Sequence, residues 1–168
     1  SYLKLWARMV EAAIANPDAA RSSIVSDTRK DWLTAAINSP VGRMAMLLGE
    51  EFSWEGPDHE KMTDEWRERA ERLLSVRSDL LCHVMAVFGT RLNWLYYADS
   101  EWTDQHIISP IQRDPDAEAS LAAISSLLGC GGQWSAPLFV RLKGLMVALA
   151  SREGGEEEGH QDLRGCAG

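Results

Sequence analysis

Apolar residues recur at helical spacing along almost the whole chain. The first stretch shows the i, i+3, i+4, i+7 pattern of an amphipathic helix, carried by Leu3, Trp6, Met9, Val10, Ala13 and Ile14. Similar patterns predict helices over 29–37, 41–52, from 63 onward, from 78 to near 89, 91–98, 102–108, 116–128 and 135–150. No stretch alternates apolar and polar residues as a strand would. The sequence therefore predicts an all-α fold, an irregular, solenoid-like array of about eight helices whose short connections favour antiparallel neighbours.

Capping residues mark one of the predicted breaks. Pro40 disfavours helical geometry at Ser39, whose hydroxyl can cap the helix that follows. Asn38 can bond the backbone at this kink, and Gly42 can let two helices approach closely. We predict a structural role for these residues.

A second break lies in the stretch LNWLYYADSEWTDQHIISPI, which combines four aromatic residues with three acids. The structural interpretation is a helix, a cap and another helix: Asp99 or Ser100 caps, Trp102 and His106 stack, and Pro110 ends the second helix. The alternative is a ligand pocket or interface in which Asp104 and His106 are the acid–base candidates. That pocket would be lined by Trp94, Tyr97, Asp99, Trp102, Asp104 and His106.

The charge balance bears on the choice of partner. A formal net charge of -8 over 168 residues argues against a general electrostatic grip on nucleic acid or anionic lipid. Three neighbouring arginines could still form a local basic patch, but acids interleave with them, which favours a solvated, salt-bridged helix face. These residues are Arg67, Arg69, Arg72 and Glu65, Glu68, Glu71.

Residues 1–150 are long enough for one helical domain. Residues 151–168 are rich in Gly and Glu and nearly free of large apolar side chains, so they are predicted to form a disordered acidic tail. No run of about 18 apolar residues and no signal peptide occurs, so we expect a cytoplasmic protein that does not span a membrane.

Catalytic and metal-binding motifs are absent from the sequence, and we assign no catalytic residue, cofactor or metal. Cys82 and His83 are adjacent, so on a helix they point to different faces. The Gly-rich run 129–132 lacks the lysine and the preceding strand of a phosphate loop, and we interpret it as a turn between helices. His59, flanked by Asp58 and Glu60, is interpreted as part of a polar loop rather than a metal site.

Three segments together resemble a known family. They are DWLTAAINSPVGRMAMLL (Asp31–Leu48), LNWLYYADSEWTDQHIISPI (Leu92–Ile111) and SAPLFVRLKGLM (Ser135–Met146). Their order is similar to that in the helical domain of unknown function found C-terminal to sirtuin-like domains in large bacterial proteins of anti-phage defence. The matching positions are Ala36, Asn38, Pro40, Gly42 and Arg43, then Asp99, Trp102, Thr103, Ile107 and Pro110.

The resemblance covers roughly residues 30–150 and implies a non-catalytic scaffold or sensor. Its expected partners are other domains of the same parent protein, a protein trigger, or a second copy. The chain begins with Ser1, and an amphipathic run starts at Tyr2, so we expect a fragment of a longer protein. Any NAD chemistry would then belong to a preceding sirtuin-like region.

Overall fold

The computed structural model describes residues 2–20, 31–51, 62–130 and 134–161, the side chains of Tyr2, Ser78 and 152–161 excepted. The chain divides into two compact units, Ser1–Gln133 and Trp134–Gly168. No strand occurs in the described residues, and the predicted all-α class is confirmed.

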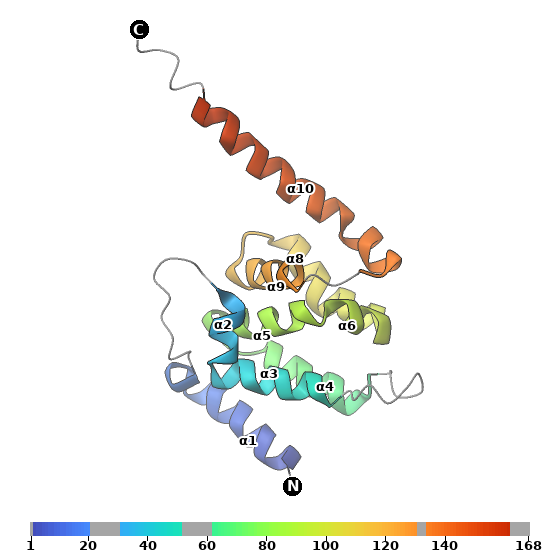
Figure 1. Ribbon diagram of the computed structural model, residues 1–168. Helices are drawn as coiled ribbons and strands as arrows, with labels where there is room; N and C mark the ends of the chain where they lie inside the picture. The colour runs from blue at the N-terminus through green and yellow to red at the C-terminus, as the bar shows by residue number, and fades with distance from the viewer. Residues whose placement is uncertain (1, 21–30, 52–61, 131–133, 162–168) are drawn as a thin grey trace. The chain divides into compact units, whose positions relative to one another are not determined.

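The first unit is a set of packed helices (Figure 1). Its elements are α1 (Tyr2–Ala15), the 3-10 turn η1 (Pro17–Ala20), α2 (Trp32–Ile37), α3 (Pro40–Glu50), α4 (Asp64–Leu74), α5 (Ser78–Thr90), α6 (Leu92–Ala98), α7 (Ser100–Thr103), the π-helical turn η3 (Asp104–Ile108), α8 (Ser109–Arg113) and α9 (Glu118–Gly129).

Helix α5 is the centre of this unit. All of residues 82–89 are buried, which is expected for a helix that is apolar on every side. It contacts α2, α3, α4, α6 and α9, and α9 is its principal partner. The remaining helices therefore each need only one apolar face.

Close approach between α5 and α9 depends on a glycine. A Cβ atom built on Gly89 would lie 2.3 Å from the backbone oxygen of Ala123 in α9. The facing surface of α9 also carries small buried side chains, including Ser120, Ala122 and Ser126. The sequence predicted Gly89 only as the approximate end of a helix, so its packing role is new.

Two buried tryptophans tie helices together through their indole nitrogens. Trp6 of α1 donates a hydrogen bond to the backbone oxygen of Met44 at 3.2 Å. Trp66 of α4 donates to the backbone oxygen of Leu48 at 3.0 Å. Both acceptors lie in α3, so α1 and α4 are anchored to the same helix.

Several predicted helix starts are confirmed. Ser39 and Thr63 each occupy the N-cap position and accept a hydrogen bond from a backbone amide of the first turn. Helix α2, in contrast, begins at Trp32 with Asp31 as its N-cap, and not at residue 29 as predicted. Helix α5 begins at Ser78, as predicted, and Arg77 holds its N-cap position without a side-chain bond.

The second unit contains α10 (Ala136–Gln161). Of the predicted tail, 151–168, the structure describes the side chain of Ser151 only. The backbone of α10 continues as a helix to Gln161. None of the helices in the described parts of the chain has the length and apolarity needed to cross a membrane.

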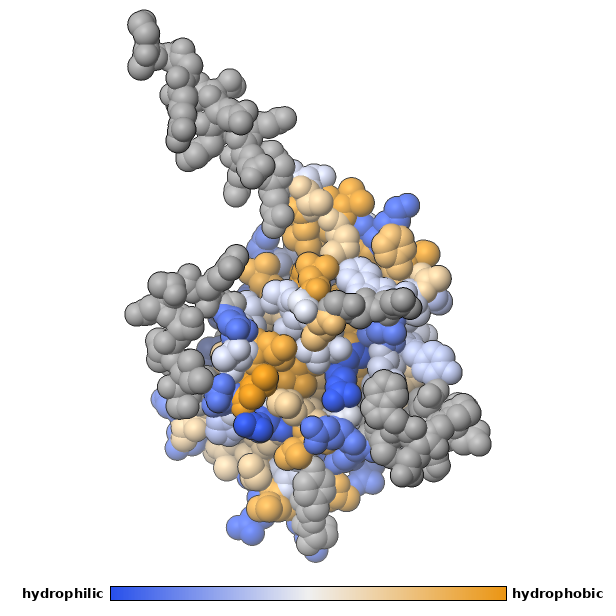
Figure 2. All heavy atoms as spheres, in the orientation of Figure 1, coloured by the Kyte–Doolittle hydropathy of each residue, from blue (hydrophilic) through white to orange (hydrophobic). Residues whose placement is uncertain are grey.

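Apolar and hydrophilic side chains are interspersed on the surface drawn in Figure 2. The large apolar side chains that stay exposed are spread over several helices. They are Leu3, Leu5 and Met9 of α1, Leu47 of α3, Tyr97 of α6, Leu121 and Leu128 of α9, and Phe139, Val140 and Val147 of α10.

Candidate functional site

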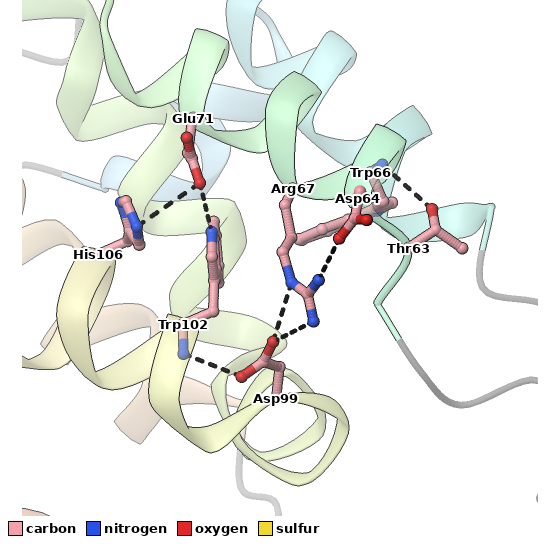
Figure 3. Close-up of polar contacts among 8 residues, drawn as sticks. All are labelled: Thr63, Asp64, Trp66, Arg67, Glu71, Asp99, Trp102 and His106. Carbon is pink, nitrogen blue, oxygen red and sulfur yellow. Dashed lines mark hydrogen bonds and ion pairs between the residues drawn. The ribbon is translucent and has the colours of Figure 1, made fainter.

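The predicted aromatic–acidic break forms a compact polar cluster against α4, shown in Figure 3. We call this cluster the Trp102 corner. It consists of Asp99, Trp102 and His106, which face Arg67 and Glu71 of α4. Arg67 and Glu71 are four residues apart and therefore lie on the same side of their helix.

Asp99 has two structural contacts. Its Oδ1 accepts a hydrogen bond from the backbone nitrogen of Trp102 at 2.9 Å, which caps α7. Its Oδ2 accepts from Nε and Nη2 of Arg67 at 2.9 and 2.6 Å. Burial alone would raise the pKa of Asp99, but the bonds from Trp102 and Arg67 outweigh it and lower the pKa. The predicted capping role is confirmed, and the partnership with Arg67 is a finding.

Trp102 is buried, and both its indole nitrogen and its ring have partners. Its Nε1 donates to Oε1 of Glu71 at 2.9 Å, and its ring meets the edge of Trp66 with centroids 5.5 Å apart. His106 stacks on Trp102 as predicted, with a centroid distance of 5.0 Å and an interplanar angle of 20°. The same Glu71 oxygen lies 3.6 Å from Nε2 of His106, which is ion-pair distance when the imidazole is protonated.

The other proposed pocket residues do not join this cluster. Tyr97 is 68% exposed, and Asp104 instead accepts a hydrogen bond from the Ser109 hydroxyl at 3.2 Å. Trp94 is half-buried and meets the edge of Trp66, with centroids 6.5 Å apart. Thr103 is fully buried, and its hydroxyl has no hydrogen-bond partner among the described residues.

Pro110 does not end the helix, so that prediction is wrong. The helix continues from α7 through the π turn η3 into α8 and ends at Arg113. A proline lacks the amide that would bond four residues back. The turn before it is widened, and Ser109 donates its amide to the oxygen of Asp104, five residues earlier. The chain thus passes Pro110 within one nearly continuous helix.

Substitution of Asp99 separates its two contacts. Asp99→Ala is expected to lower the free energy of unfolding by about 1 kcal/mol for the lost cap, with less than about 1 kcal/mol more for the partly exposed ion pair. Asp99→Asn keeps a capping oxygen and should lose only the ion-pair part. Urea unfolding followed by circular dichroism measures both. Equal losses for the two variants would contradict the capping role.

The Asn38–Gly42 kink is built as predicted. Asn38 Nδ2 donates to the backbone oxygen of Thr34 at 2.8 Å, and the Ser39 hydroxyl accepts from the Gly42 amide at 3.0 Å. Pro40 is the first residue of α3. A Cβ atom on Gly42 would lie 2.1 Å from the oxygen of Ala36, so α2 and α3 require glycine here.

The arginines of α4 form ion pairs, but mainly with other helices. Arg69 binds both carboxylate oxygens of Glu51, and Arg72 binds both of Glu11 in α1. The predicted salt-bridged face is therefore present, with Arg67 paired to Asp64 of the same helix, but Arg69 and Arg72 pair with acids outside α4. Sequence spacing reveals neighbours within one helix, whereas these acceptors are 18 and 61 residues away. Since these guanidiniums already have carboxylate partners, they provide little free positive charge for a phosphate backbone.

Cys82 and His83 are both buried in α5. Burial raises the pKa of the Cys82 thiol to about 11, and the thiol donates to the backbone oxygen of Asp79 at 3.2 Å. Nδ1 of His83 has no hydrogen-bond partner among the described residues. We therefore assign both side chains to the core rather than to a nucleophile–base pair.

His83 gives the fold a pH dependence. Burial lowers the pKa of its imidazole below the ordinary 6.5, and the charges of Asp79 and Glu118 oppose this only partly. Below about pH 6.5 the unfolded chain binds a proton that the folded chain does not, so stability falls as the pH decreases. His83→Gln should reduce this slope between about pH 7 and about pH 5 in urea unfolding. Parallel slopes for both proteins would contradict the assignment.

No group of His, Cys, Asp and Glu side chains able to hold a metal ion occurs within 2–20, 31–51, 62–130 and 134–151. His59 with its acidic neighbours, and Gly131 and Gly132 of the Gly-rich run, lie outside the described residues. Comparison of the chain with protein-family models, with curated proteins and with solved structures finds no match.

Proposed function

We propose that this chain is a non-catalytic helical module that holds or senses other proteins. This is the role implied by its resemblance to the helical domain beside sirtuin-like domains of bacterial defence proteins. The observation that carries the proposal is that both acid–base candidates contact groups of the same chain. Asp104 accepts a hydrogen bond from the Ser109 hydroxyl, and His106 stacks on Trp102 with its Nε2 3.6 Å from Oε1 of Glu71. A general acid or base must instead reach a substrate proton.

Exposed apolar side chains support an interaction role. Tyr97 and Val140 are 68% and 73% exposed, and α1 presents three large apolar residues to solvent. Among the exposed apolar residues, those of α1 lie together on one helix, and proteins commonly bind one another through apolar residues that gather on a surface. The partners we propose are other domains of a cytoplasmic parent protein, a protein trigger, or a second copy.

Site-specific photocrosslinking tests the proposal. A benzoylphenylalanine placed at Tyr97 or Val140, in the cells that make the protein, is expected to yield adducts of defined mass. The same probe at the exposed polar residue Gln105 is the control and should yield none. Absence of adducts at both apolar positions, or NAD hydrolysis by the purified chain, would overturn the proposal.

One observation favours a second candidate, a small enzyme or ligand-binding protein. The π turn η3 contains Asp104 and His106, and such turns are frequent at functional sites. In this case Asp104→Ala and His106→Ala should abolish a turnover that the intact chain performs. If both variants fold and every measured turnover is unchanged, this candidate is removed.

A further inference from the structure

A groove of about 550 Å³ lies between α1 and α4. Its floor is apolar, with Trp6 3% exposed and Val10 fully buried, and Leu3 is partly exposed beside them. The groove is distinct from the Trp102 corner, although Glu71 contributes to both.

The α4 edge of the groove is acidic. Glu65, Glu68 and Glu71 follow at three-residue spacing and all line it. The two arginines that line it are already paired, Arg69 with Glu51 and Arg72 with Glu11. No ion pair involves Glu65 or Glu68 within the part of the chain that the structure describes. The groove therefore combines an apolar floor with uncompensated negative charge.

We propose that this groove binds an amphipathic helix of another protein that carries Lys or Arg along one edge. The apolar face of that helix contacts Leu3 and Ala7, which line the groove and are exposed above the buried Trp6 and Val10. Its basic edge meets Glu65 and Glu68. Two helices border the groove, which suits the helix-in-groove mode of recognition. Helix α1 has 14 residues and is about 21 Å long, so it can flank a partner of three to four turns. This inference rests on the proposed interaction function.

The proposal requires that the partner helix has both an apolar face and a basic edge. Three synthetic helical peptides of about 16 residues test these two requirements separately. The first has leucines on one face and lysines along its edges. The second replaces the lysines with glutamates, and the third replaces the leucines with serines. In NMR titrations of the isotope-labelled chain, the first peptide is expected to bind at least about tenfold more tightly than either other peptide. Its amide shifts should concentrate in α1 and α4.

Two double variants that remove the same amount of negative charge, one inside the groove and one outside it, test whether the acids of the groove bind the basic peptide. Glu65→Gln with Glu68→Gln should weaken binding of the basic peptide several-fold and reduce its salt dependence. Glu101→Gln with Asp114→Asn changes the net charge equally at exposed positions outside the groove, and should leave binding unchanged.

Three outcomes would overturn the groove assignment: no binding of the basic peptide, equal binding of the acidic one, or shifts centred on other helices. A dimer that the Glu65→Gln, Glu68→Gln variant abolishes would assign the groove to a second copy and also overturn it. Crosslinks at Tyr97 or Val140 with no peptide binding would remove the groove alone. Peptide binding in a chain that hydrolyses NAD would remove only the non-catalytic function.

Discussion

Gly42→Ala is expected to destabilise the fold by about 3 kcal/mol or more, because the added methyl group would overlap the backbone of α2. Its Cβ would lie 2.1 Å from the oxygen and 2.6 Å from the carbonyl carbon of Ala36. Backbone atoms in a packed helix cannot move aside as a flexible side chain can. The helices must separate, and the Ser39 cap and the burial of Val41 would suffer with them.

Gly49→Ala is the matched control, since Gly49 lies in the same helix. There the nearest atom to an added Cβ is the Arg91 Nε at 3.8 Å, an ordinary contact. Alanine should stabilise α3 at this position by roughly 0.5–1 kcal/mol through its higher helix propensity. Urea unfolding of the two variants should shift in opposite directions. A loss at Gly42 no larger than the change at Gly49 would contradict the close packing of α2 and α3.

Trp66→Ala is the second large effect, with an expected loss of about 3–5 kcal/mol. The side chain is 2% exposed and lies among Phe88, Trp94 and Trp102, with ring centroids 5.5–6.5 Å away. Its removal leaves a large cavity and leaves the backbone oxygen of Leu48 without the indole donor. The ring or its hydrogen bond links α4, which carries Trp66, to four other helices: α3, α5, α6 and α7.

Two further variants separate the contributions of the hydrogen bond and of burial to this loss of stability. Trp66→Phe keeps an aromatic ring but not the donor, and should lose about 1–3 kcal/mol for the unsatisfied carbonyl and the smaller ring. Tyr97→Ala removes an aromatic side chain that is 68% exposed, and should change stability by less than about 0.5 kcal/mol. Circular dichroism is the suitable readout, because tryptophan fluorescence changes with the substitution itself. A loss below about 1 kcal/mol for Trp66→Ala would contradict its place in the core.

Local features could be predicted from the sequence because they depend on residues close together in the chain. The Ser39 and Asp99 caps and the stacking of Trp102 on His106 follow from spacings of three or four residues. The same reasoning predicted that Gly42 permits a close approach. These features together define the two breaks, Asn38–Gly42 and Asp99–His106.

Features that depend on the tertiary arrangement could not be predicted. Nothing in the spacing of Arg67 identifies Asp99 as its partner, 32 residues away. The sequence indicated Gly89 only as a helix end. Its role in close packing could not be predicted, because its partner, Ala123, belongs to a distant helix. Tyr97 has the same apolar character as its buried neighbours, and only the packing of α6 leaves it exposed.

The wide turn before Pro110 bears on how this chain tolerates changes of length. A regular helix turns about 100° per residue, so removing one residue normally rotates everything after it out of register. In η3 the extra residue is already contained in a wider turn. Removing one residue between Asp104 and Ile108, together with replacing Pro110 by alanine, would restore a regular turn and keep Trp102 and Ile111 in nearly their present relation. The same deletion in α5 would turn Phe88 and Gly89 away from their partners. Among sequences descended from a common ancestor with this chain, single-residue gaps are therefore expected at η3 in chains that also lack the proline, and not in α5.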